Sequence, residues 1–540
     1  QRLEVLTMKK TCMGLLVLQI LLRCQNSPGL ELDFQGSKLE VVINGNTYKS
    51  GDTFDWGYAD TKGSLSISGT VRNPGRSPIT FSSVPQLTVG GTHAGDISIS
   101  QPSTQTLSAG GSAAFSLTIV PQFIRSRTAT LNMATNADSP NFELKLRGSG
   151  YGAVLLKDIR AGAGNSSPYA FISYQGFVYF AATDGINGFQ LWRTDGTPEG
   201  TTLFKNFSPG GNLHATDHSM TVLNGLLYLR GEDTTHGDEL WKTDGTVAGT
   251  VFLADIYSVS NNDADPTFLT TLGSELIFRA RRNTTESYEV FKSNGNAGNF
   301  TFVKDINPTA STSSNASYFT PMGGNAYFQA NDGTNGAELW KTDGTTGGTV
   351  MVADLYAGAT GSSPYNLVAL GGFLYFCAET SAQGFELRRT DGTTISLVID
   401  LWPGGNDGCH STNLGQIGLW NSTLLFSGSN GSGVTSELYK SDGSIGNATL
   451  VKDINPTGFS APTGFVQLGN YTYFSATDGS NGVELWRTDT TAAGTTLASN
   501  IDLTNASSSP TGMTVLGDSL IFSATTTALG TELYIYLPPP

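Results

Sequence analysis

The sequence predicts an all-β protein in which an eight-bladed β-propeller follows an N-terminal immunoglobulin-like β-sandwich. Three observations lead to this prediction. A phrase of eight residues recurs after residue 150, with spacings of 47 to 51 residues between copies. Each copy holds four short alternating segments separated by Asp-Gly or Asn-Gly turns, which is the pattern of β-hairpins. The stretch before the first copy shows similar alternation without the repeat.

The composition excludes several classes of protein. The chain has 540 residues, with 30 Lys and Arg against 45 Asp and Glu, and its formal net charge is −15. That balance disfavours a nucleic-acid partner, because such binding depends on clustered cations. Only 14% of the residues are charged, 66 are Gly, and the one marked apolar run is short. A disordered chain, a collagen and a multi-pass membrane protein are therefore excluded.

Residues 1–29 are interpreted as a signal peptide region. Lys9 and Lys10 precede an apolar run, Met13–Leu22, which is shorter than the roughly 20 residues that a membrane span needs. We expect cleavage and secretion, with no membrane span in the mature chain. A retained anchor and a lipoprotein signal ending at Cys24 are alternatives, although Arg23 occupies the place of a small residue in the second.

Residues 30–150 are predicted to form the immunoglobulin-like sandwich. Alternating segments at 65–71, 112–119, 128–133 and 142–146 are separated by clusters of Gly, Pro, Asn and Asp. Short strands with a turn about every ten residues are typical of β-sandwiches.

Residues 151–540 contain eight copies of the repeat. The best copies are 191–197, 239–246 and 338–345, and weaker ones begin at 289, 386, 437, 484 and 532. The equivalent positions of the phrase are Trp192, Trp241, Phe291, Trp340, Arg388, Tyr439, Trp486 and Tyr534, of which all but Arg388 are aromatic. An upstream marker repeats with the same period, at Phe180, Leu229, Phe278, Phe328, Phe376, Phe426, Phe474 and Phe522.

Four strands per copy make each repeat a propeller blade. In the seventh copy we expect strands at 464–468, 471–475, 483–488 and 495–500, and blades of known families run about 40–50 residues. The eighth copy stops after its third strand, whereas the segment 154–159 matches the fourth strands at 302–306 and 450–454. We therefore expect 154–159 to pair with the last blade and join the two ends of the ring, which removes an exposed edge.

Residues 151–540 resemble the ELWxxDGT repeat family, whose defining phrase they contain. The resemblance implies a secreted or surface protein and names no reaction. Asn294 and Arg388 depart most from the family pattern. The N-terminal part resembles immunoglobulin-like modules of the choice-of-anchor D and ASPM/SPD-2/hydin type, on the segments 71–75, 107–112 and 146–150 and on Pro121. That resemblance implies a spacer or a binding element.

The recurring polar residues receive a structural interpretation. The Asp of each phrase is expected to stabilise its own turn, beside a Gly with positive φ, rather than to act in catalysis. The recurring Trp is expected to wedge between blades rather than to stack on a sugar. A second series ends each fourth strand, where it either caps a turn or forms a rim of calcium sites; its members are Asp158, Asn206, Asp255, Asp305, Asp354, Asp400, Asp453 and Asn500. No other cofactor is predicted.

Residues that break the symmetry are candidates for function. His214, His218, His236 and Asp233 fall in loops of the second blade, and imidazole with carboxylate suits zinc or another transition metal. Solvated loop histidines are the alternative. Five arginines also break the repeat, and they either hold an acidic glycan or a partner carboxylate or form ion pairs with neighbouring acids; they are Arg279, Arg281, Arg282, Arg388 and Arg389.

Two further features concern an exported chain. Cys377 and Cys409 are the cysteines left after the signal region, and we expect one disulfide between them. Ten sequons are predicted glycosylation sites: Asn165, Asn206, Asn283, Asn299, Asn315, Asn421, Asn430, Asn447, Asn470 and Asn505.

The sequence contains no nucleophile elbow, phosphate-binding Gly loop or acid pair that stands apart from the repeat. We therefore expect a secreted, non-enzymatic structural or adhesive protein of the cell surface or extracellular matrix, including a self-assembling subunit of a filament or sheath. Its partners would be copies of itself, other surface or matrix proteins, or glycans. The alternative is a propeller that binds or cleaves glycans.

Overall fold

The computed structural model describes residues 37–540 except 139, 208–212, 214–217, 234, 259–261, 284–286, 310, 410–415 and 432–435. Its contacts divide the chain into two compact units. The first comprises the described residues up to 122 together with 126–150, and the second comprises 123–125 and 151–540. No helix in the described part of the chain is long and apolar enough to cross a membrane.

The first unit is a β-sandwich. One sheet has the strand order β2-β1-β4-β9-β7, and the other contains β6, β10, β11 and β3. A short 3₁₀ helix, Ala94–Asp96, precedes β7. The strands are β1 (Glu40–Ile43), β2 (Asn46–Tyr48), β3 (Thr53–Asp60), β4 (Leu65–Arg72), β5 (Ile79–Thr80), β6 (Leu87–Gly90), β7 (Ile97–Ile99), β8 (Thr106–Leu107), β9 (Ser112–Ile119), β10 (Arg125–Ala134) and β11 (Asn141–Lys157).

Alternation along these strands places one side of each sheet in a shared core. In β9, Ala113 and Phe115 are buried while Ala114 between them is exposed. Val41, Leu131 and Leu144 from other strands join the same hydrophobic cluster. Two antiparallel sheets that face each other across such a core make a sandwich, as the sequence predicted.

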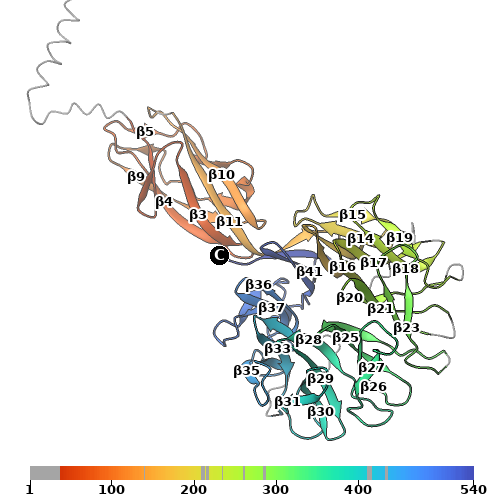
Figure 1. Cartoon of the computed structure of the whole chain (residues 1–540). Coiled ribbons are helices and arrows are strands. Elements are labelled where there is room, and N and C mark those ends of the chain that lie inside the picture. Colours follow the sequence, from red (N-terminus) through yellow and green to blue (C-terminus); the bar gives the residue numbers. More distant parts are fainter. Residues whose placement is uncertain are drawn as a thin grey trace, which may run out of the picture. The chain divides into compact units, whose positions relative to one another are not determined.

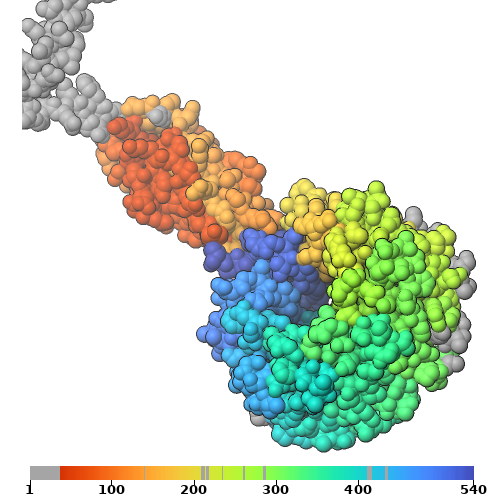
Figure 2. Space-filling model, in the orientation of Figure 1, coloured from red at the N-terminus to blue at the C-terminus, as the bar shows by residue number. Residues whose placement is uncertain are grey.

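The second unit consists of four-stranded antiparallel sheets, consistent with a propeller, that follow one another around a common centre (Figure 1). Figure 2 shows a hollow at that centre. Seven of these sheets have their strands in sequence order. The first strands are β12 (Tyr169–Tyr174), β16 (Met220–Leu223), β20 (Thr267–Leu272), β24 (Ser317–Met322), β28 (Tyr365–Leu370), β32 (Gly418–Trp420), β36 (Thr463–Leu468) and β40 (Thr511–Leu516).

The second strands are β13 (Phe177–Thr183), β17 (Leu226–Asp233), β21 (Glu275–Ala280), β25 (Asn325–Asn331), β29 (Phe373–Thr380), β33 (Thr423–Gly428), β37 (Tyr471–Thr477) and β41 (Ser519–Thr526). The third strands are β14 (Phe189–Thr194), β18 (Gly237–Thr243), β22 (Glu289–Ser293), β26 (Ala337–Thr342), β30 (Gln383–Thr390), β34 (Glu437–Ser441), β38 (Val483–Thr488) and β42 (Gly530–Leu537). The fourth strands are β15 (Thr202–Lys205), β19 (Val251–Ala254), β23 (Thr301–Lys304), β27 (Val350–Ala353), β31 (Ile395–Ile399), β35 (Thr449–Lys452) and β39 (Thr496–Ser499).

The eighth sheet takes its fourth strand from the beginning of the second unit. Residues 152–157 of β11 pair with β42, with Gly152 opposite Leu537 and Val154 opposite Ile535. This is the segment that the sequence matched to the other fourth strands.

Hydrophobic clusters lie between neighbouring sheets rather than within single sheets. Each of eight clusters combines side chains of two sheets. One of them joins Phe180 and Trp192 of the first sheet to Ile521 and Ile535 of the eighth. The marker residues of the sequence are fully buried in this packing.

Candidate functional site

A Glu opens seven of the eight phrases and anchors the loop that follows the fourth strand of its sheet. Glu338 is fully buried. Its Oε1 accepts the N–H groups of Tyr356 at 3.0 Å and Ser362 at 2.8 Å, and its Oε2 accepts the Ser362 hydroxyl at 2.5 Å. The equivalent carboxylates also accept backbone N–H groups from their own loops; they are Glu239, Glu289, Glu386, Glu437, Glu484 and Glu532. The sequence analysis did not identify this role.

Burial and hydrogen bonding act in opposite directions on these carboxylates. Burial raises the pKa of Glu239 and Glu386 to about 8, and that of Glu289 to about 7. The backbone N–H donors lower the pKa but do not outweigh burial.

The Asp of the phrase stabilises its own turn, which confirms the structural interpretation. Asp343 accepts the Thr345 N–H at 2.8 Å and the Thr345 hydroxyl at 2.7 Å. These hydrogen bonds lower the pKa of Asp343. The intervening Gly344 has φ +84°, a conformation in which Gly carries no steric penalty. The same pair of bonds is made by Asp195, Asp244, Asp391 and Asp489.

The aromatic and basic residues of the phrase join one sheet to the next. Trp192, Trp241, Trp340 and Trp486 are buried in clusters between sheets, so the prediction that Trp wedges between blades is confirmed. The following Lys or Arg donates to the carbonyl of the next sheet's turn. These pairs are Arg193–Gly245, Lys242–Gly295, Lys341–Gly392, Arg389–Gly443 and Lys440–Thr490, with distances of 2.8–3.2 Å.

The polar residues after the fourth strands do not gather into a metal site within the described residues. In that part of the chain, the group of three potential metal ligands is Asp238, Asp263 and Asp265 instead. Some of the recurring residues make hydrogen bonds within the protein; Asp158 accepts the Gly162 N–H and Asp400 accepts the Gln383 amide. Calcium therefore stays a prediction.

The histidines predicted as metal ligands have separate surroundings. His236 contacts Asp233, with 2.9 Å between Nδ1 and Oδ2, and its ring stacks on Phe252 at 4.2 Å. His218 stacks on Phe268, with 5.9 Å between ring centroids. His214 lies outside the described residues, and the metal assignment stays a prediction.

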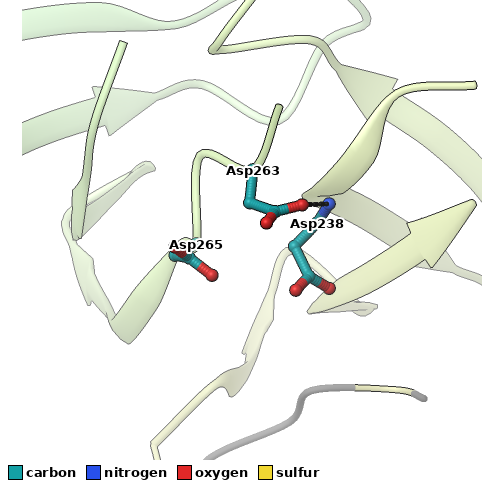
Figure 3. Close-up of side chains that lie close together, drawn as sticks. All are labelled: Asp238, Asp263 and Asp265. Carbon is teal, nitrogen blue, oxygen red and sulfur yellow. Dashed lines mark hydrogen bonds between the residues drawn. The ribbon is translucent and has the colours of Figure 1, made fainter. Parts of the chain in front are cut away.

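The main departure from repeat symmetry is a network of charged residues at the second and third sheets. Asp238, at the start of β18, and Asp265, before β20, both accept hydrogen bonds from Arg230. Asp263 accepts the backbone N–H of Asp238 at 3.0 Å, and all three acids have oxygens within 4.8 Å of one another (Figure 3).

Positive charge is already present among these three acids. Arg281 lies 3.3 Å from Asp265 and donates to the Asp263 carbonyl at 2.7 Å, and the Tyr288 hydroxyl donates to Asp265. Burial lowers the pKa of Arg230, but Asp238 and Asp265 outweigh it and raise the pKa. Two guanidinium groups thus supply the charge that a bound cation would bring, and the cluster is an ion-pair network.

Sequence reasoning identified Arg281 but missed Arg230 and its acids. The available signal was position: Arg230 directly follows a buried marker residue, where other repeats carry Ala181, Cys377, Ser475 or Ser523.

Three of the other arginines that break the repeat donate their hydrogen bonds to neutral groups. Arg279 donates to the Thr267 hydroxyl at 3.2 Å. Arg388, which replaces a phrase Trp, is buried and donates to the Ala378 carbonyl and to Gln383. Arg389 belongs to the contacts between sheets, and Arg282 lies over the Phe302 ring at 4.2 Å.

Cys377 and Cys409 form a disulfide. It joins β29 to the loop that enters the sixth sheet. Seven of the predicted glycosylation residues are exposed, namely Asn165, Asn299, Asn315, Asn421, Asn447, Asn470 and Asn505. Asn206, Asn283 and Asn430 are half-buried. Modification of all ten stays a prediction.

No model of a known protein family matches the chain, and no curated protein matches it. Among solved structures, a puromycin hydrolase mutant complexed with PGG is similar at 13% identity and a TM-score of 0.41, over 69% of this chain and 61% of the other. A puromycin-hydrolyzing peptidase of Mycobacterium tuberculosis has 12% identity and a TM-score of 0.43, with the same coverage. Prolyl oligopeptidase B from Galerina marginata has 12% identity and a TM-score of 0.39, over 63% of this chain and 51% of the other. The chain thus spans 51–61% of these proteins, and the likeness is distant and one of fold alone.

Proposed function

We propose that this chain is a secreted, non-enzymatic structural or adhesive protein of the cell surface or extracellular matrix, built as an immunoglobulin-like module and a closed eight-bladed ring. The use of the repeated phrase carries the proposal. Its Glu anchors a loop, its Asp holds a turn, and its Trp and Lys or Arg join neighbouring sheets. The recurring polar groups make hydrogen bonds that hold loops, turns and neighbouring sheets in place. The repeat therefore builds a rigid body rather than a series of reactive sites.

Two contacts support ring closure. β11 supplies the outer strand of the eighth sheet, and the hydrophobic cluster around Trp192 contains residues of the first and eighth sheets. When the first and last sheets pack against each other, neither leaves its outer face exposed to solvent. The recurring phrase supports membership of the ELWxxDGT repeat family.

Export and assembly are also part of the proposal. The disulfide between Cys377 and Cys409 suits an oxidising compartment, as does the apolar run near the start of the chain. A rigid ring of sheets that shares its chain with an immunoglobulin-like module suits a subunit that repeats in a filament or sheath.

Electron microscopy of natively purified secreted material tests this proposal, with and without a calcium chelator. We expect ordered filaments, sheets or sleeves. Loss of order on chelation would add calcium to the assembly, whereas single discs under every condition would contradict the assembly role.

Glycan binding is a second candidate function, which one observation favours. Arg279 lies between the ring of Phe268, on the first strand of the third sheet, and the ring of Tyr288, in the loop before its third strand.

A further inference from the structure

Six of the eight first strands carry a bulge at an equivalent position. The pairing register shifts there in β12, β20, β24, β28, β36 and β40. The residue within each bulge has positive φ; the six are Ala170, Phe268, Tyr318, Asn366, Gly464 and Gly512. Gly, Ala and Asn suit this conformation, whereas a bulky aromatic residue rarely adopts it.

Two neighbouring sheets nevertheless place aromatic residues in the bulge. Phe268 has φ +54° and Tyr318 has φ +63°, and His218, just before β16, has φ +69°. Their rings form a row across three adjacent sheets, because His218 stacks on Phe268 at 5.9 Å and Phe268 meets Tyr318 edge to face at 5.6 Å. His218 is exposed and Tyr318 is 42% exposed. Backbone strain of this kind is typical of functional sites.

Arg279 lies beside this row without an acidic partner. Its guanidinium carbon is 5.0 Å from the Phe268 ring centroid and 5.3 Å from that of Tyr288. Its Nε donates to Thr267, and within the described residues its other nitrogens have no hydrogen-bond partner. The nearby Asp265 already accepts bonds from Arg230 and Tyr288 and pairs with Arg281. Arg279 thus brings a half-buried guanidinium that forms no ion pair among the described residues, although the charge of Asp265 acts on it from a distance.

We propose that Phe268, Arg279 and Tyr318, with His218 beside them, bind a carboxylate-bearing sugar such as a uronic or sialic acid residue of a glycan. The guanidinium of Arg279 would take the carboxylate through its planar pair of N–H groups. The aromatic faces would pack against the apolar C–H face of the sugar ring, in keeping with sites lined by aromatic side chains and few polar groups.

An acidic peptide fits this arrangement less well than a sugar does. Acidic motifs are recognised by clusters of unpaired arginines, whereas Arg230 and Arg281 are committed to Asp265 here. One available cation beside a row of rings suits a rigid ring that carries one carboxylate.

Isothermal titration calorimetry of the full secreted chain tests the proposal. The probes are trigalacturonate and sialyllactose as acidic saccharides, maltotriose as a neutral one, and hexaglutamate as an acidic peptide. We expect one or both acidic saccharides to bind, and maltotriose and hexaglutamate to bind at least tenfold more weakly. Uronic acid and sialic acid are thereby distinguished. Absence of binding by both acidic saccharides, or equal binding by hexaglutamate, would overturn the proposal.

Variants locate the site. Arg279→Gln and Tyr318→Ala should each weaken binding at least tenfold. Arg389→Gln is the matched control, because Arg389 also lies over an aromatic ring, 4.4 Å from the Phe373 centroid, but donates to a backbone carbonyl between sheets. Thermal melts establish that each variant is folded, and Arg279→Lys replaces Arg279→Gln should the latter unfold. Unchanged affinity in folded Arg279 and Tyr318 variants would refute the site.

The saccharide site rests on the proposed surface role, because it names a ligand for that role. Each of the two proposals can nevertheless be refuted without the other. Filaments seen by microscopy without saccharide binding would remove only the site. Saccharide binding by discs that never assemble would remove only the assembly role.

Discussion

Replacement of Glu338 by Ala tests whether the buried carboxylate is what holds the loop between the fourth and fifth sheets. The change leaves two backbone N–H groups, of Tyr356 and Ser362, and the Ser362 hydroxyl without their acceptor. Ser362 is fully buried. An unsatisfied buried donor costs about 1–3 kcal/mol, so Glu338→Ala should lower the free energy of unfolding by at least about 3 kcal/mol.

Glu338→Gln is the matched control, because the first sheet carries the same exchange naturally. Gln190 accepts the Phe207 N–H through Oε1 at 2.9 Å and donates through Nε2 to the Asn187 carbonyl at 2.8 Å. One amide oxygen thus retains part of the bonding, and we expect a loss of about 1–2 kcal/mol.

Urea denaturation followed by fluorescence gives both free energies, and limited proteolysis reports on opening of the loop at residues 354–362. The reasoning is refuted if Glu338→Ala stays within about 0.5 kcal/mol of the parent, or if Gln at this position is as harmful as Ala.

Three further predictions concern stability. Because burial raises the pKa of Glu239 and Glu386 to about 8 in the folded chain, the folded state binds protons more tightly than the unfolded state. The resulting stabilisation is complete below the ordinary Glu pKa and is lost as the pH rises towards 8, so Tm should fall between pH 5 and pH 9; a Tm that rises over this range contradicts the sign. Cys377→Ser with Cys409→Ser removes a cross-link between residues 32 apart in sequence, and should lower the free energy of unfolding by about 3–4 kcal/mol; reduction of the parent by dithiothreitol should match it in urea denaturation. Deletion of residues 151–160 removes the outer strand of the eighth sheet and should lower Tm clearly, whereas an unchanged Tm would show that this strand does not hold the ring.

The strands could be predicted from sequence because the same pattern of alternating residues and turns occurs in eight copies. For the seventh copy the expected segments 464–468, 471–475, 483–488 and 495–500 differ from β36 to β39 by at most two residues at either end. Hairpin turns with Gly at positive φ and alternating burial are local properties, so a single chain displays them. The Asp turn was predictable for the same reason, since its partner Thr lies two residues away.

The role of Glu338 could not be predicted in this way. Its partners are backbone N–H groups 18 and 24 residues away. Almost every residue type has a backbone N–H group, so the sequence does not show which residue donates. The network around Arg230 was hidden for a related reason, because Asp238 and Asp265 come from a strand start and a loop. Only the fold brings those two segments together.

The position after each buried marker shows where a regular repeat can acquire individual chemistry. The marker is held by packing between sheets, and its neighbour along the second strand faces the opposite side of the sheet, where Ala181 and Cys377 lie in clusters shared with the next sheet. Ser475 and Ser523 are small and buried there, Cys377 forms the disulfide, and Arg279 meets the aromatic row. A substitution at this position changes the side of the sheet opposite the marker, so we expect it to leave the marker's own packing in place. We therefore expect the specificity of related rings to differ first at this position and at the bulge beside it. Exchange of Arg279 and Tyr318 between related chains, measured as a change in saccharide preference, tests that expectation.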